Sequence, residues 1–153
     1  MTPTNLSRLA AWAGISPETH AHLFLHTIFD GDIDEDWYPL WYLISPTGNV
    51  KYKFLGPDPT DPGADPRVVD DVWLARVMWK MWELGMQPIV QGRDPEHYPN
   101  FICSVQDLTI TSTERAESAT LALLLSAKSA NVEELVDILA EPCDTSYAPN
   151  ESD

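Results

Sequence analysis

Three side chains near the start of the chain have types and a spacing that could do chemistry. His22, His26 and Asp30 follow one another at intervals of four residues, so on a helix they would lie one turn apart on one face. Two imidazoles and a carboxylate in that arrangement can bind a divalent cation or serve as acid and base groups. A metal site also needs further ligands and a supporting shell, which His20 and His97 supply only if the fold brings them near. We therefore expect ordinary polar positions without a metal or cofactor, and keep a metal-dependent enzyme using His22 and His26 as an alternative.

The densest charge run covers residues 30–36, where five of seven side chains are carboxylates. The alternating aspartates that start at Asp30 resemble the first positions of an EF-hand calcium loop. However, Glu35 occupies the position that needs glycine for the turn, and Trp41 stands where the bidentate glutamate belongs. The run is therefore not an EF-hand.

Two large aromatic residues follow this acidic run directly. Carboxylates can steer the loop toward a basic protein surface, and neighbouring aromatic side chains can then anchor the contact. The competing interpretation is a solvated loop with the aromatics folded beneath it. Our hypothesis assigns partner binding to Asp32, Asp34, Asp36, Trp37 and Tyr38.

The overall charge narrows the range of partners. Nine basic against 24 acidic side chains give a formal net charge of −15, which repels nucleic-acid backbones and anionic membranes and favours basic protein partners. The chain has no apolar run long enough for a membrane span and no secretory signal pattern, so we expect a cytoplasmic protein. Cys103 lies in an apolar run and Cys143 in a polar tail, which favours reduced thiols over a disulfide.

Among the elements that must position the candidate site residues, the clearest helix covers residues 66–84. Asp65 can cap its first turn, Pro66 suits its first position, and Gly85 can end it. Its apolar stripe is wide, and we expect Trp73 and Trp82 near the core. Because one small sheet cannot cover such a helix, a homodimer through Trp79 or its neighbours is possible.

The rest of the first half predicts two helices and a hairpin. A short helix capped by Thr4 ends at Gly14, and a second helix runs from Ser16 to Phe29, with a strand over 22–29 as the competing interpretation. Apolar runs at 39–44 and 49–55 flank a turn cluster and predict a hairpin, with the first strand the more central one. In the second strand we expect the core-facing side chains to be Val50, Tyr52 and Phe54.

The second half predicts two strands and two helices. Short strands at 88–91 and 101–105 should pair antiparallel. A capping box at Thr111 and Glu114 predicts a long helix over 113–128, and Asn131 with Glu134 predicts a last short one.

These elements predict an α/β (α+β) fold. Its mostly antiparallel four-stranded sheet lies between helical layers, with helices 66–84 and 113–128 packed on the sheet. The 44% apolar content suits a single domain over residues 1–140, and residues 141–153 read as a disordered acidic tail.

The order helix, hairpin, long helix, two strands and long helix resembles the phage ABA-sandwich proteins, small phage and prophage products mostly of unknown function. The resemblance rests on residues 6–12, the aromatic hairpin, and residues 69–76 and 114–122, which open the two long helices. It covers about residues 4–130 in the order of elements. It implies a sheet between helical layers and a phage origin, and because the family has no agreed catalytic residues, it transfers no site.

Enzyme signatures such as G-x-S-x-G, a glycine-rich phosphate loop, C-x-x-C and H-E-x-x-H are missing from the sequence. We therefore expect a small acidic phage-type accessory protein that is not an enzyme. It would bind a host or phage protein in the host cytoplasm and could inhibit a host system. A small-ligand-binding module and a nucleic-acid mimic remain alternatives beside the metal-dependent enzyme.

Overall fold

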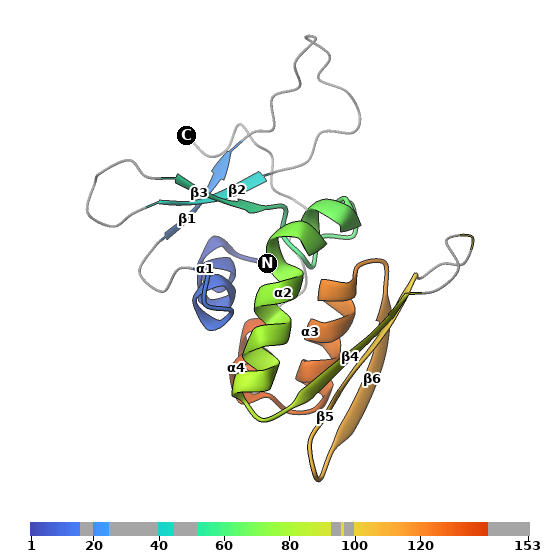
Figure 1. The fold of residues 1–153 in the computed structure, drawn as a ribbon. Coiled ribbons are helices and arrows are strands. Elements are labelled where there is room, and N and C mark those ends of the chain that lie inside the picture. Colours follow the sequence, from blue (N-terminus) through green and yellow to red (C-terminus); the bar gives the residue numbers. More distant parts are fainter. Residues whose placement is uncertain (16–19, 25–39, 45–51, 93–95, 97–99, 141–153) are drawn as a thin grey trace.

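The computed structural model describes residues 1–15, 20–24, 40–44, 52–92, 96 and 100–140 (Figure 1). Helices and strands both contribute, as expected for an α+β protein. In chain order the elements are α1 (Pro3–Trp12), β1 (His20–Phe24), β2 (Leu40–Ile44), β3 (Tyr52–Gly56), α2 (Pro66–Glu83), β4 (Gln87–Gly92), β5 (Phe101–Gln106), β6 (Thr111–Ala116), α3 (Ala119–Ser129) and α4 (Glu133–Ile138).

The strands form two separate antiparallel sheets of three strands each, in the orders β1-β2-β3 and β4-β5-β6. The prediction of one four-stranded sheet is therefore wrong. The hairpin of β2 and β3 is confirmed, with β2 central as expected, and β4 pairs antiparallel with β5 as expected. In Figure 1 the first sheet lies above α1, and the second lies against α3.

The second sheet gains its third strand from residues that the sequence pattern assigned to a helix. Thr111–Ala116 is β6, and α3 begins only at Ala119, with the Ser118 hydroxyl accepting the Leu121 N–H at 3.0 Å. The Thr111 and Glu114 pair matched a capping box by coincidence, whereas β-branched threonines at alternate positions suit an extended strand. A tight turn at Asp107–Ile110 joins β6 to β5, so pairing was available locally.

Helices cover only one face of this second sheet. Cys103 and Val105 of β5 are fully buried on the side where α3 packs, whereas Ile89 of β4 is 42% exposed. The exposed side chains on the opposite face include Gln91 and Thr113. The expectation of a sheet between helical layers is therefore wrong for these strands, because the helix needed for the second layer is absent from the described chain.

Residues 20–24 form strand β1, so the helix expected from Ser16 to Phe29 is wrong where the structure describes that segment. His22 pairs with Tyr42 of β2 in this strand. The competing strand interpretation agrees with β1 from His22 onward, and residues 25–29 lie outside the described segments. Aromatic and aliphatic residues at helical spacing also fit a short strand that pairs with an apolar neighbour.

A bulge in β3 changes the direction of its side chains. Trp41 pairs with Gly56 and Tyr42 with Phe54, which leaves Leu55 as the extra residue. As a result Leu55 is fully buried, whereas Phe54 is 41% exposed and contacts the Tyr42 ring at 5.3 Å between centroids. The inward orientation predicted for Phe54 is therefore wrong, because strict alternation does not anticipate an extra residue.

Helix ends are set by local hydrogen bonds that the sequence partly predicts. α2 begins and ends as expected, with Asp65 accepting the Arg67 N–H at 3.0 Å and Gly85 in the left-handed region. α1 is capped by Thr2 instead of Thr4. Asn131, expected to cap α4, has a φ of 62° and ends α3, where the next N–H bonds the Ala127 oxygen at 3.0 Å.

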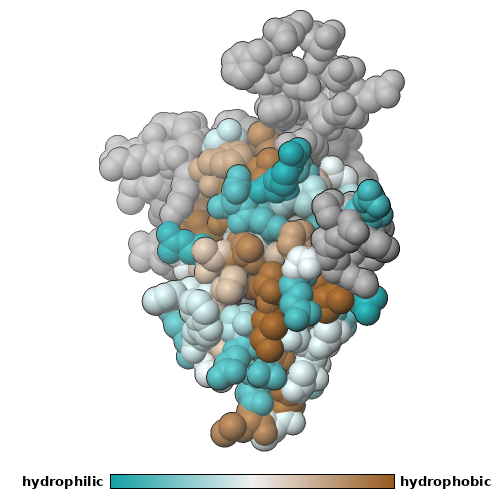
Figure 2. Space-filling view, turned by 45° about the vertical axis from the view of Figure 1, so that its right-hand side comes forward, coloured by the Kyte–Doolittle hydropathy of each residue, from teal (hydrophilic) through white to brown (hydrophobic). Residues whose placement is uncertain are grey.

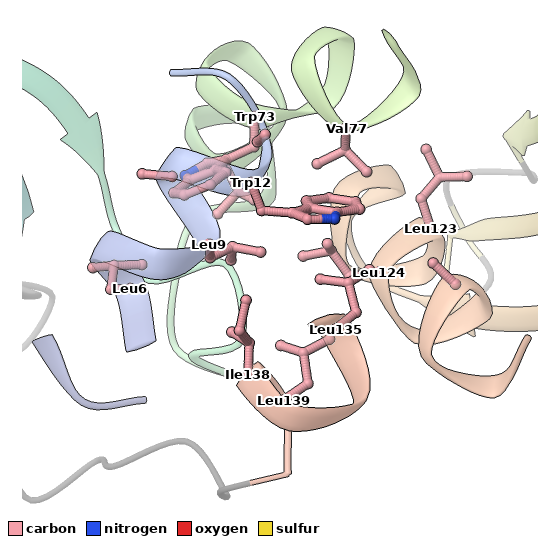
Figure 3. Close-up of a cluster of buried hydrophobic side chains, with 14 of the residues drawn as sticks. Leu6, Leu9, Trp12, Trp73, Val77, Leu123, Leu124, Leu135, Ile138 and Leu139 are labelled. Atoms are coloured by element: carbon pink, nitrogen blue, oxygen red, sulfur yellow. The ribbon is translucent and has the colours of Figure 1, made fainter. Parts of the chain in front are cut away.

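Side chains from all four helices converge on one hydrophobic core (Figure 3). Trp73 of α2 is fully buried, as predicted, and Trp12 of α1 is 5% exposed. Trp82 was also expected near the core, but 52% of its surface is exposed. The buried residues that line up with Trp73 on α2 are Val69, Val77 and Met81.

Candidate functional site

Two exposed tryptophans form a pair on the outer face of α2. Trp79 is 61% exposed and Trp82 is 52% exposed. Their ring centroids lie 5.8 Å apart at an interplanar angle of 77°, which is an edge-to-face contact. The contact between the two rings fixes their relative orientation on the protein surface.

The rotation of α2 explains why these two tryptophans face outward. Trp73, Val77 and Met81 are fully buried and fix the inner face of the helix. At about 100° per residue, Trp79 and Trp82 point roughly 120–180° away from Trp73, on the opposite side. The α2 helix therefore buries Trp73 in the core and exposes Trp79 and Trp82 to solvent.

Basic, acidic and apolar groups surround the pair, and the exposed Glu83 follows Trp82 directly. Arg76 lies one turn before Trp79, is exposed, and has no hydrogen-bond or ion-pair partner within the described segments. Leu84, just after the helix, is 47% exposed. The Lys80 ammonium lies 5.9 Å from the centroid of the Trp12 ring, so this cation is directed toward α1. The outer face of α2 thus presents the two indole rings next to the unpaired guanidinium of Arg76.

A pocket of about 290 Å³ lies between the N-terminal ends of α2 and α3. Its walls are mainly apolar, and Arg115, Glu117 and Asp61 contribute the charged groups. The lining residues are Pro59, Asp61, Pro62, Ala64, Pro66, Val69, Arg115, Ala116, Glu117, Ser118, Leu121 and Leu125. No sequence pattern predicted this pocket, because its lining residues come from separate parts of the chain.

Turns and side-chain hydrogen bonds fix the loop that forms one wall of the pocket. The Asp58 carboxylate accepts a 2.6 Å hydrogen bond from the Met1 ammonium and another, of 2.8 Å, from the Thr60 N–H. Asp61 accepts the Gly63 N–H at 2.9 Å. The wall is therefore held in shape without a ligand.

The residues predicted from sequence to form a site are largely outside the described segments. These are His26, Asp30, Asp32, Asp34, Asp36, Trp37, Tyr38 and His97. His20 and His22 belong to β1, so His22 is not on the helix that the metal hypothesis needed. Within the described segments, no group of three or more His, Cys, Asp or Glu side chains is placed to hold a metal ion.

Cys103 is a free, fully buried thiol whose Sγ lies 3.5 Å from the Ala119 oxygen. Burial raises the pKa of Cys103 to about 12, and the Asp70 carboxylate adds to this increase. A protonated thiol beneath α3 is not activated as a nucleophile. Cys143 lies outside the described part of the chain.

Comparisons with protein-family models, with curated proteins and with solved structures each found no match. None of the described helices is long and apolar enough to span a membrane.

Proposed function

We propose that the chain is a small acidic phage-type accessory protein that binds a host or phage protein without catalysing a reaction. The observation that carries this proposal is the exposed pair of Trp79 and Trp82 on α2. Tryptophan is enriched among the residues that dominate binding energy in protein interfaces, because it brings a large contact area with few rotatable bonds.

The energetic scale supports a contact at this face. Complete burial of two half-exposed tryptophans removes roughly 250 Å² of largely apolar surface, worth about 6 kcal/mol before the cost of association. An edge-to-face pair loses little side-chain entropy on binding, since each ring already restrains the other. Figure 2 shows one face of the molecule, on which hydrophobic residues are interspersed with hydrophilic ones.

Charge determines the chemistry of the proposed partner. At a formal charge of −15 the chain attracts basic surfaces and repels acidic ones over about a Debye length. The acidic run at 30–36 with Trp37 and Tyr38 belongs to the same proposal as a steering element. The phage origin in this proposal is based on the resemblance of the sequence to the phage ABA-sandwich proteins.

Affinity capture from a bacterial lysate tests the proposal with three baits. They are the unchanged protein, the double variant Trp79→Ala/Trp82→Ala, and the control Leu108→Ala, which truncates a side chain that is even more exposed but lies in the β5–β6 turn. We expect a basic protein bound by the first and third baits and lost from the second, with all three baits folded by circular dichroism. Equal recovery on all three baits would remove the tryptophan pair from the binding surface.

A second copy of the chain is the competing occupant of this face. Sedimentation equilibrium separates the two cases: a homodimer gives a concentration-dependent mass that the double variant abolishes. A monomer at all concentrations leaves the face to a different protein.

A further inference from the structure

From the pocket between α2 and α3 we infer a second binding site, distinct from the tryptophan pair, that accepts one free amino acid with an apolar side chain. The pocket volume of about 290 Å³ lies near the lower end of small-molecule sites, which run from roughly 300 Å³ upward. A molecule of amino-acid size is therefore the appropriate class. None of the residues that line the pocket belongs to the proposed protein contact.

The apolar part of the pocket suits a hydrocarbon or ring. Prolines 59, 62 and 66 form one side, and Leu121 and Leu125 of α3 form another. Both leucines are only half-buried in the structure, although they belong to a helix whose neighbouring residues are buried. Removing these surfaces from water provides the main driving force for binding a hydrophobic side chain.

Two unpaired charges of opposite sign line the same pocket. Arg115 is at the end of β6 and Glu117 follows two residues later. Neither side chain has an ion-pair or hydrogen-bond partner in the described part of the protein. Because Arg115 and Glu117 are only two positions apart in the chain, their Cα atoms lie within roughly 7 Å of each other. A guanidinium can bind a carboxylate, and a carboxylate can bind an ammonium group.

These charges select a zwitterion over a simple ion. An anionic ligand would have to approach a chain of formal charge −15 and two carboxylates that line the pocket, Asp61 and Glu117. A cationic ligand would pair with these carboxylates but would offer no group of opposite charge to Arg115. An amino acid presents a carboxylate to Arg115 and an ammonium to Glu117, and its side chain enters the apolar part.

The nearby N-terminus of α3 does not provide the anion site, because its N–H groups are already used. The Asp70 carboxylate accepts the Ala119 and Thr120 N–H groups at 3.1 and 2.9 Å, and the Ser118 hydroxyl accepts that of Leu121. Asp70 lies on α2, so these bonds also hold the two helical walls together. The pocket is thus formed before binding, which limits the entropy cost.

Titration of the full chain with L-phenylalanine, its amide and its N-acetyl derivative tests the inference by NMR of the Leu121 and Leu125 methyl groups. We expect phenylalanine to shift these resonances in a saturable way. The amide lacks the carboxylate and the N-acetyl compound lacks the ammonium, so each should bind at least about tenfold more weakly. Arg115→Gln should abolish discrimination against the amide, and Glu117→Gln discrimination against the N-acetyl compound.

Two further variants complete the experiment: one is a control outside the pocket, and the other fills the pocket with a larger side chain. Arg76→Gln removes an unpaired arginine from the outer face of α2 and should leave phenylalanine binding unchanged. Leu125→Phe should block binding with the fold retained, as checked by circular dichroism. Equal affinity for all three ligands, an unchanged affinity in Arg115→Gln, or no methyl shift at millimolar phenylalanine would each overturn the inference. Binding only of phenylalanine within a peptide would overturn it in favour of a protein-anchoring pocket.

Discussion

The indole Nε1–H of Trp73 donates a 3.0 Å hydrogen bond to the backbone oxygen of Leu55. Leu55 is the extra residue of the bulge in β3, and both residues are fully buried. The bond therefore joins the first sheet to α2 inside the core. It also satisfies the polar end of a fully buried tryptophan side chain.

Substitutions at Trp73 should separate packing from hydrogen bonding. We expect Trp73→Ala to lower the free energy of unfolding by roughly 3–5 kcal/mol, because a cavity opens in the core. Trp73→Phe keeps a ring but leaves the Leu55 oxygen without its donor, at a cost of about 1–3 kcal/mol. Urea denaturation measures both values. Trp79→Ala is the control and should cost within about 0.5 kcal/mol; a cost for Trp79→Ala as large as that for Trp73→Ala would show that the buried face is misassigned.

Asp70 should matter more than its neighbour Asp71. The Asp70 side chain accepts two backbone N–H groups of α3 and the Thr120 hydroxyl, the last at 2.8 Å. Asp70→Ala removes these acceptors and should destabilise the protein by about 1–3 kcal/mol. Asp71 is exposed and accepts no hydrogen bond within the described segments, so Asp71→Ala should have an effect below about 0.5 kcal/mol. Thermal unfolding of the two variants measures the difference. Equal midpoint temperatures would contradict the contact between Asp70 and the start of α3.

The Cys103 thiol should resist alkylation until the protein unfolds. Its pKa is raised by burial to about 12 from an ordinary value of 9.0, so folding favours the neutral thiol. This contribution to stability is complete below about pH 9 and is lost as the pH rises from 9 toward 12. In a Cys143→Ser background, mass spectrometry should detect slow iodoacetamide labelling at pH 8 and rapid labelling in urea. Rapid labelling of the native protein would show that β5 is open to solvent.

The acidic run should affect how fast a partner associates. Replacement of Asp32, Asp34 and Asp36 by lysine reverses its charge, and we expect slower association with the captured protein, while dissociation changes little. Surface plasmon resonance across a salt series measures both rates. The difference between the reversed and unchanged proteins should shrink as salt increases. An association rate that the triple reversal does not alter at any salt concentration would identify residues 30–36 as solvated surface.

Sequence alone predicted the elements that carry strong local signals. Asp65, Pro66 and Gly85 mark both ends of α2, and the helix occupies the expected residues. The hairpin of β2 and β3 and the pairing of β4 with β5 were also predicted correctly. Each of these features depends on residues close to one another in the chain, where patterning and turn chemistry agree.

The features that failed depend on tertiary contacts. Thr111 and Glu114 suit a capping box and a strand equally, and only pairing with β5 decides between them. The apolar pattern of α2 did not reveal that Trp82 lies outside the core, because that depends on which neighbours cover the helix. The pocket brings together residues from the loop before α2, the start of α2, the end of β6 and α3, a combination that no local spacing encodes.

The affinity of the captured partner for the unchanged protein and for Trp79→Ala/Trp82→Ala tests the central claim most directly. Isothermal titration calorimetry should show roughly a thousandfold weaker binding by the double variant, since exposed tryptophans that anchor an interface contribute about 2 kcal/mol or more each. Leu108→Ala should bind as the unchanged protein does. Equal affinities for the unchanged protein and the double variant would contradict the claim that this pair is the contact surface.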